Sequence, residues 1–256
     1  MPRSSLPVRP SAAIALAVLA GCATPRPTPA PPLDYRTLVA APDRLEADRA
    51  LDAGRRPAEM LSFIEVRPGS RVAELGAGGG YTTELLARAV APNGVVYAQN
   101  SAFLLGLVNE PWTKRLARPS MHDVVRLDRE FDDPLPPEAR GLDLVVMNAV
   151  YHDTVWMKVD RARMNRAVFD ALAPGGAFVV IDSSARPGSG IADVSTLHRI
   201  DEATVREEVE RAGFRLAGSG NFLRNPTDAR DWNSSPRAAG ERRGTSDRFA
   251  LRFVKP

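Results

Sequence analysis

Cysteine, lysine and long apolar runs are scarce in this chain. A single cysteine in 256 residues excludes an intramolecular disulfide and a cysteine-based zinc cluster. Three of the 34 basic residues are lysines, and the formal net charge of +3 gives no strong field, so we expect no nucleic-acid partner. The apolar run at 12–20 is too short to span a bilayer, which needs about 20 residues. With 44% hydrophobic and 25% charged residues, the composition predicts one globular domain with appendages.

The N-terminal residues have the pattern of a secretory signal. Arg3 and Arg9 precede the short apolar run, and small residues follow it. The run ends in Leu19-Ala-Gly-Cys22, which resembles the lipobox of bacterial lipoproteins and implies cleavage before Cys22 and lipidation of its thiol. The alternative is a buried N-terminal helix with an ordinary core cysteine. Five prolines within residues 22–32 cannot continue a helix and favour an extended tether.

These features predict three segments and a location. We expect a lipoprotein signal peptide at residues 1–21, a Pro-rich tether at 22–39 and a folded domain at 40–256. The lipid on Cys22 would hold the protein at a membrane of the bacterial cell envelope, on its periplasmic face.

Strand-like and helix-like segments alternate through the domain. The expected strands are 71–75, 95–98, 124–127, 142–147, 177–181, 214–217 and 249–254. The expected helices are 43–64 (broken at Gly54 and Pro57), 81–90, 101–117 (interrupted by Pro111), 161–172 and 202–212. This alternation predicts an α/β sheet whose ligand lies beyond the carboxyl ends of the strands. The polar segment 218–247 is expected to be a long loop, acting as a lid or a docking surface.

A glycine-rich turn follows the first expected strand. Its sequence is Val72-Ala-Glu-Leu-Gly-Ala-Gly-Gly-Gly-Tyr-Thr-Thr83. Tyr81 stands where a dinucleotide fingerprint requires its third glycine, and the lysine of a P-loop is absent. The remaining pattern, Glu74-x-Gly76-x-Gly78-x-Gly80, resembles motif I of the class I S-adenosylmethionine-dependent methyltransferases.

Other segments extend this resemblance over residues 60–182. They match the second strand, the fourth strand and the turn before the fifth strand, at 94–100, 143–148 and 172–177. The segments 52–57, 79–82, 151–153, 197–201 and 247–256 resemble a subfamily of predicted exported bacterial methyltransferases. The resemblance implies a Rossmann-like fold: a mostly parallel seven-stranded sheet with helices on both faces and an antiparallel last strand.

The resemblance also implies S-adenosylmethionine as cofactor and residues that would bind it. They are Glu74, Gly76, Gly78, Gly80, Tyr81, Asn100, Asp128 and Asn148. Glu74 would recognise the ammonium of the cofactor and Asp128 its adenine amine. Asn100 stands where the family has a ribose-binding acid, and an amide lacks the charge that strengthens such a bond. The alternatives are a solvated strand end for Glu74, a surface acid for Asp128 and a core contact for Tyr81.

Three consecutive residues after the fourth strand are the expected catalytic group. His152 would act as the base for a protonated acceptor, with Tyr151 and Asp153 beside it. The alternative is that Tyr151 and His152 pack under the following helix as a wall of the substrate site. Farther along, His198, Arg199 and Asp201 form a second polar cluster after the fifth strand. Arg199 could anchor an acidic substrate, or Asp201 could only cap the helix that follows. No two histidines have a metal-ligand spacing, so no metal is expected.

Three functions compete for this sequence. The first is methyl transfer to an unidentified acceptor by an exported, lipid-anchored enzyme. The second is a non-catalytic binding or structural lipoprotein on a methyltransferase scaffold, because a fold does not establish a function. The third, a nicotinamide enzyme, is disfavoured by Tyr81 and by the missing acid at Asn100.

Overall fold

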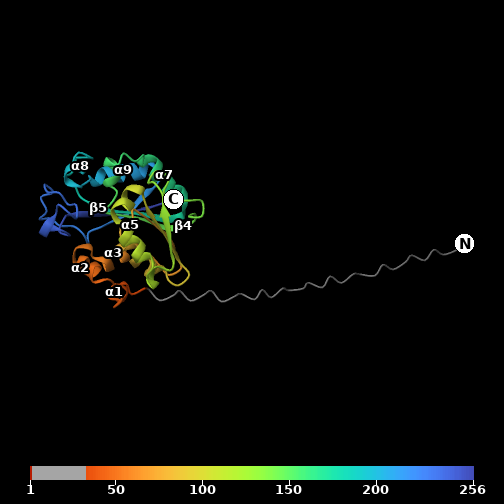
Figure 1. Cartoon of the computed structure of the whole chain (residues 1–256). Helices are drawn as coiled ribbons and strands as arrows, with labels where there is room; N and C mark the ends of the chain where they lie inside the picture. Colours follow the sequence, from red (N-terminus) through yellow and green to blue (C-terminus); the bar gives the residue numbers. More distant parts are fainter. Residues whose placement is uncertain (2–32) are drawn as a thin grey trace. The chain divides into compact units, whose positions relative to one another are not determined.

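The computed structural model of the chain describes Met1 and residues 33–256, and the folded unit runs from Leu33 to Pro256 (Figure 1). The predicted signal peptide and Cys22 lie outside the described residues, as does most of the predicted tether. Residues 33–39 belong to the folded unit, because Tyr35–Val39 form helix α1 and the Tyr35 hydroxyl donates to the Val66 carbonyl at 2.7 Å. The domain therefore begins earlier than residue 40.

Seven strands form one sheet, in the order β3-β2-β1-β4-β5-β7-β6. Their bounds are β1 Arg71–Leu75, β2 Val95–Asn100, β3 Val124–Asp128, β4 Leu142–Asn148, β5 Leu172–Ser183, β6 Arg215–Gly220 and β7 Arg248–Val254. Strands β1 to β5 pair in parallel, and β7 is antiparallel to both β5 and β6. The predicted seven-stranded, mostly parallel sheet with an antiparallel last strand is confirmed. From β1 the chain adds β2 and β3 on one side of the sheet, and then β4 and β5 on the other side. A ligand is expected at this reversal of strand order, between β1 and β4.

Helices cover both faces of this sheet, as predicted (Figure 1). They are α2 Glu46–Arg55, α3 Pro57–Ile64, α4 Tyr81–Val90, α5 Ala102–Leu116, α6 Asp153–Trp156, α7 Arg161–Ala171, α8 Val194–Leu197 and α9 Glu202–Arg211, with short 3-10 turns η1 Pro119–Met121 and η2 Gly240–Arg242. One apolar cluster joins α3 and α4 to one face, and a second joins α7 and α9 to the other. Among the described residues, no helix is both long and apolar enough to cross a membrane.

Two helical predictions differ from the structure. The segment predicted as one broken helix is two helices, which meet at Arg56 with a φ of 46°. Helix α5 continues through Pro111, where an interruption was predicted. A proline inside a helix removes one backbone hydrogen bond. The adjacent Trp112 is fully buried against Ala98 and Met121, and this packing holds the helix against the sheet.

Candidate functional site

The glycine loop joins the carboxyl end of β1 to the first turn of α4. Gly76, Gly78 and Gly80 all have positive φ values, of 72°, 55° and 84°. A Cβ on Gly76 would lie 2.8 Å from Val150, and a Cβ on Gly80 would lie 2.6 Å from Trp112, so both positions require glycine. By contrast, a Cβ on Gly78 or Gly79 would have no neighbour within 4 Å. The loop is therefore packed at its two ends and open in its middle, where a ligand can approach the backbone.

Two amide side chains from the end of β2 hold the loop in this shape. Gly76 N donates to Gln99 Oε1 at 3.0 Å. Gly78 N donates to Asn100 Oδ1 at 2.8 Å, and Asn100 Nδ2 donates to the Gly78 carbonyl at 3.1 Å. A carboxylate could accept the first of these Asn100 bonds but could not donate the second. The amide at Asn100 therefore has a local structural reason, and its predicted ribose contact stays a prediction.

Glu74 lies at the end of β1, beneath the loop, and is 2% exposed. The Thr83 hydroxyl of α4 donates to Glu74 Oε2. Burial raises the pKa of Glu74 to about 7, although the Thr83 hydrogen bond and the charge of Arg55 act against the rise. This burial excludes a solvated strand end. A cation bound beside Glu74 would favour its carboxylate form.

Tyr81 is the first residue of α4 and is 7% exposed. Its hydroxyl donates to Asp52 Oδ1 at 2.6 Å, and the Arg55 guanidinium lies 4.2 Å from the centre of its ring. Burial and the nearby Asp52 carboxylate raise the pKa of Tyr81. These contacts agree with the alternative of a core contact that fixes the start of α4 against α2.

The remaining two predicted cofactor residues lie at neighbouring strand ends. Asp128 ends β3 in register with Asn100, and its side chain is 47% exposed and paired with Arg126 at 2.8 Å. Asn148 ends β4, and its Nδ2 donates to Thr82 Oγ1 in the first turn of α4 at 3.2 Å. Both residues therefore lie on the carboxyl edge of the sheet, which is where a bound nucleotide would meet them.

His152 is the centre of a second group on the same edge, formed after β4 and β5. Its Nδ1 lies 2.7 Å from Asp182 Oδ1, and its backbone N donates to Asp182 Oδ2 at 2.8 Å. Its Nε2 lies 3.1 Å from Asp153 Oδ1 and 3.3 Å from His198 Nδ1. Burial by itself lowers the pKa of His152, but Asp182 and Asp153 outweigh it and raise the value to about 10. With this pKa the His152 ring carries a proton on both nitrogens at neutral pH. This protonation state does not favour the predicted role of His152 as a free base.

Tyr151 does not join this group, although it precedes His152 in the sequence. It is fully buried, and its hydroxyl donates to Glu208 of α9 at 2.8 Å and accepts from Asn165 of α7 at 2.9 Å. The phenol therefore connects two helices on one face of the sheet. This geometry does not support its predicted place in the catalytic group. It agrees with the packing part of the alternative, and a role of Tyr151 as a wall of the substrate site stays a prediction.

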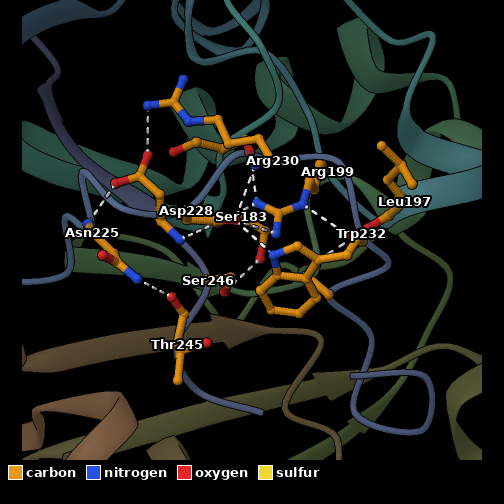
Figure 2. A network of polar contacts seen from close by, with 12 residues as sticks. Ser183, Leu197, Arg199, Asn225, Asp228, Arg230, Trp232, Thr245 and Ser246 are labelled. Carbon is orange, nitrogen blue, oxygen red and sulfur yellow. Dashed lines mark hydrogen bonds and ion pairs between the residues drawn. The ribbon is translucent and has the colours of Figure 1, made fainter. Parts of the chain in front are cut away.

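The segment that follows β6 is held by buried charges around Arg199 (Figure 2). The Arg199 side chain is fully buried, pairs with Asp228 at 2.9 Å and donates to the Trp232 carbonyl at 3.0 Å. Asp201 accepts from Ala203 N at 3.1 Å and so caps α9, as one alternative predicted. Arg199 is consequently a structural residue of this segment, rather than an anchor for substrate.

Sequence reasoning missed Asp182 and did not place His198 beside His152. Asp182 directly follows the predicted strand 177–181, and His198 lies 46 residues after His152. An isolated bridge between Ser184 and Ile200 brings the segment containing His198 to the end of β5. The usable signal was positional, because polar residues that follow neighbouring parallel strands share one edge of the sheet.

Comparisons with known proteins find methyltransferases that are similar to this chain in sequence or in fold. Residues 25–127, which include the glycine loop and the first three strands, match the family model of Protein-L-isoaspartate(D-aspartate) O-methyltransferase (PCMT). A trans-aconitate 2-methyltransferase of Variovorax paradoxus is 31% identical over 130 residues, which are 50% of this chain and 45% of that relative. The chain thus matches less than half the length of this relative.

Solved structures show the fold over most of the chain. A SAM dependent methyltransferase of Aquifex aeolicus has a TM-score of 0.57 and 14% identity, and the likeness covers 88% of this chain and all of that one. A putative methyltransferase of Haloferax volcanii, solved with the Trm112 methyltransferase activator, has a TM-score of 0.56 and 20% identity, over 87% and 98%. The chain thus shares the fold of these solved methyltransferases, and its residues 25–127 match a methyltransferase family model in sequence.

Proposed function

We propose that this protein binds S-adenosylmethionine and transfers its methyl group to an acceptor that is still unidentified. The observation that carries the proposal is the glycine loop, whose backbone is open at Gly78 and Gly79 and packed at both ends. This opening lies on the carboxyl edge of the sheet, beside the point where the strand order reverses.

The residues around the opening suit the parts of this cofactor. The amino-acid tail would lie on the loop above Glu74, whose buried carboxyl group would gain from a nearby ammonium. The nucleoside would extend along the ends of β2 and β3, toward Asp128. Asn148 and the group around His152 follow β4, so the acceptor would approach from that side. Alignment of the acceptor with the methyl group can supply much of the acceleration, about 7–11 kcal/mol in well-oriented reactions.

Calorimetry on the full chain tests the proposal. We expect S-adenosylmethionine, and its demethylated product, to bind with one site per chain, and Gly78→Asp to abolish the binding. The side chain of this variant would occupy the open middle of the loop. Gly141→Asp is the matched control, because Gly141 has a similar φ of 62° and open space but lies at the amino end of β4. If the native protein does not bind S-adenosylmethionine at millimolar concentration, the proposal is wrong, and the chain has the methyltransferase fold without the activity.

The proposal includes an exported, lipid-anchored protein. It rests on the sequence pattern at residues 1–32, with two arginines, a short apolar run, Cys22 and the proline-rich segment. Cys22→Ser should release the protein from the bacterial membrane fraction, because acyl chains could no longer be attached to the thiol. Cleavage between Gly21 and Cys22 would be seen in the mass of the mature protein. A Cys22→Ser variant that stays in the membrane fraction would contradict the anchor.

A further inference from the structure

Three potential metal ligands meet at the end of β4. His152 lies in the turn that follows this strand, Asp153 begins α6, and His198 directly follows α8. His152 Nε2 lies 3.1 Å from Asp153 Oδ1 and 3.3 Å from His198 Nδ1, and the last two atoms lie 3.5 Å apart. Two imidazole nitrogens and one carboxylate oxygen thus form a nearly equilateral triangle.

We propose that His152, Asp153 and His198 bind one divalent transition-metal ion of the Zn²⁺ type. The circle through the three ligand atoms has a radius of about 1.9 Å, whereas Zn²⁺ lies about 2.0–2.2 Å from nitrogen and oxygen ligands. An ion slightly above the plane of the triangle would therefore lie at bonding distance from all three atoms. The other side of the ion would stay open for water or for an oxygen or nitrogen atom of an acceptor.

Asp182 provides the support that such a site requires. Asp182 is fully buried. Its Oδ2 accepts from the backbone N of His152, and its Oδ1 faces the Nδ1 of the His152 ring. An ion that binds here replaces the proton on Nε2, while the proton on Nδ1 faces Asp182; the Nε2 lone pair then faces Asp153 and His198. Metal-binding histidines usually have this second contact to a carboxylate, which fixes the tautomer and the orientation of the ring.

The chain also holds the other two ligands in place. His198 has a φ of 50°, a backbone conformation that side-chain-bearing residues rarely adopt, and its carbonyl accepts from the Ser234 hydroxyl at 2.7 Å. The indole N–H of Trp156 donates to Asp153 Oδ1 at 2.8 Å. The His198 side chain is 30% exposed and that of Asp153 19%, whereas that of His152 is 8% exposed. The site therefore has a fixed inner ligand and a side that solvent can reach.

The ligand set indicates the class of metal. Imidazole nitrogen suits Zn²⁺, Fe²⁺, Co²⁺ and Ni²⁺, whereas Mg²⁺ and Ca²⁺ prefer oxygen ligands alone. We therefore expect Zn²⁺ to bind in the presence of excess Mg²⁺. This inference does not depend on the proposed function, since metal binding is measured without cofactor or acceptor.

Metal-free full-length protein, prepared by dialysis against a chelator, is the sample for the test. Titration with Zn²⁺, followed by calorimetry and by metal analysis after removal of unbound ion, should give one ion per chain. His198→Ala should lose this ion, and His198 is the most exposed ligand, so the variant is expected to fold. Asp182→Asn should weaken Zn²⁺ binding by about 10–100-fold, because it removes the carboxylate behind His152.

His122→Ala is the matched control. His122 is an exposed histidine that also contacts an aspartate, Asp123, at 3.0 Å, but the metal-ligand group found in the described residues does not include it. This variant should retain one Zn²⁺ per chain. Co²⁺ in place of Zn²⁺ should give visible absorption bands that depend on His198. Equal Zn²⁺ binding by the native protein and His198→Ala, or no retained ion in the native protein, would overturn the proposal and leave a hydrogen-bonded Asp–His–His chain.

Discussion

Arg199 and Asp228 form an ion pair at 2.9 Å in which both side chains are almost completely buried, with exposed fractions of 0% and 1%. Asp228 also accepts from the indole N–H of Trp232 at 2.7 Å (Figure 2). It accepts from the backbone N of Asp247 at 2.6 Å as well. Charge-assisted hydrogen bonds of this kind connect the segment after β6 to the ends of β5 and β7. Polar residues of that segment therefore stabilise its packing against the rest of the domain.

Removal of the Asp228 carboxylate should destabilise the protein strongly. Asp228→Ala would leave the Arg199 guanidinium buried without its charge partner, and breaking a buried pair in this way costs about 3–5 kcal/mol. Urea unfolding would measure the loss. Asp231→Ala, three residues away at an exposed aspartate, should change the free energy of unfolding by less than about 0.5 kcal/mol. A loss below about 1 kcal/mol for Asp228→Ala would mean that Arg199 finds another partner.

Glu74 should make stability depend on pH near neutrality. Its pKa in the folded protein, about 7, lies above the ordinary value of 4.5, so the folded state binds the proton more tightly than the unfolded state. This contribution to the free energy of unfolding therefore falls as pH rises from about 4.5 through 7. Glu74→Gln removes this effect. The free energy of unfolding of the variant, relative to that of the native protein, should therefore be up to roughly 3 kcal/mol higher at pH 8–9 than at pH 4.

Unfolding by urea at several pH values checks this sign, and Glu59→Gln serves as a control because Glu59 is half exposed on α3. The native protein and Glu59→Gln should show parallel pH profiles. A parallel profile for Glu74→Gln as well would contradict the assignment of a protonated, buried Glu74.

The amide of Asn100 should be needed for the shape of the glycine loop. In the native protein Asn100 Nδ2 donates to the Gly78 carbonyl at 3.1 Å. Asn100→Asp keeps an acceptor for Gly78 N but places a carboxylate oxygen, in place of this donor, against the carbonyl. A buried group left without its partner costs about 1–3 kcal/mol, so the variant should unfold at lower urea concentration at pH 7. Asn93→Asp, at an exposed turn residue, is the control for the added charge. Equal stability of the two variants would show that the loop does not depend on the amide.

The sequence predicted the fold because its signals are local. Apolar runs such as 142–147 and 177–181 mark strands that are buried on both faces, and glycines at 76, 78 and 80 mark a turn with three positive φ values. The mostly parallel sheet with an antiparallel last strand, and the position of the loop at the carboxyl edge, follow from these signals and the family resemblance. Pro111 was misleading, because burial of the adjacent Trp112 holds the helix across the missing hydrogen bond.

The detail of the candidate site depends on contacts between distant parts of the chain. His152 and His198 are 46 residues apart, so their contact has no signature in either local sequence. Neighbouring residues also separate in space. His152 lies over the end of β5, whereas the Tyr151 hydroxyl reaches α9 on one face of the sheet. Side-chain direction in a turn is set by tertiary packing, which residue order alone does not give.

Tyr151 should therefore contribute to stability without contributing to cofactor or metal binding. Tyr151→Phe removes the hydroxyl that donates to Glu208 and accepts from Asn165, while the ring still fills its buried position. The partners left unpaired should lower the free energy of unfolding by about 1–3 kcal/mol. Calorimetry should give S-adenosylmethionine and Zn²⁺ affinities within about twofold of the native protein, a difference of about 0.4 kcal/mol. Loss of cofactor or metal binding in a folded Tyr151→Phe protein would return this residue to the functional group around His152.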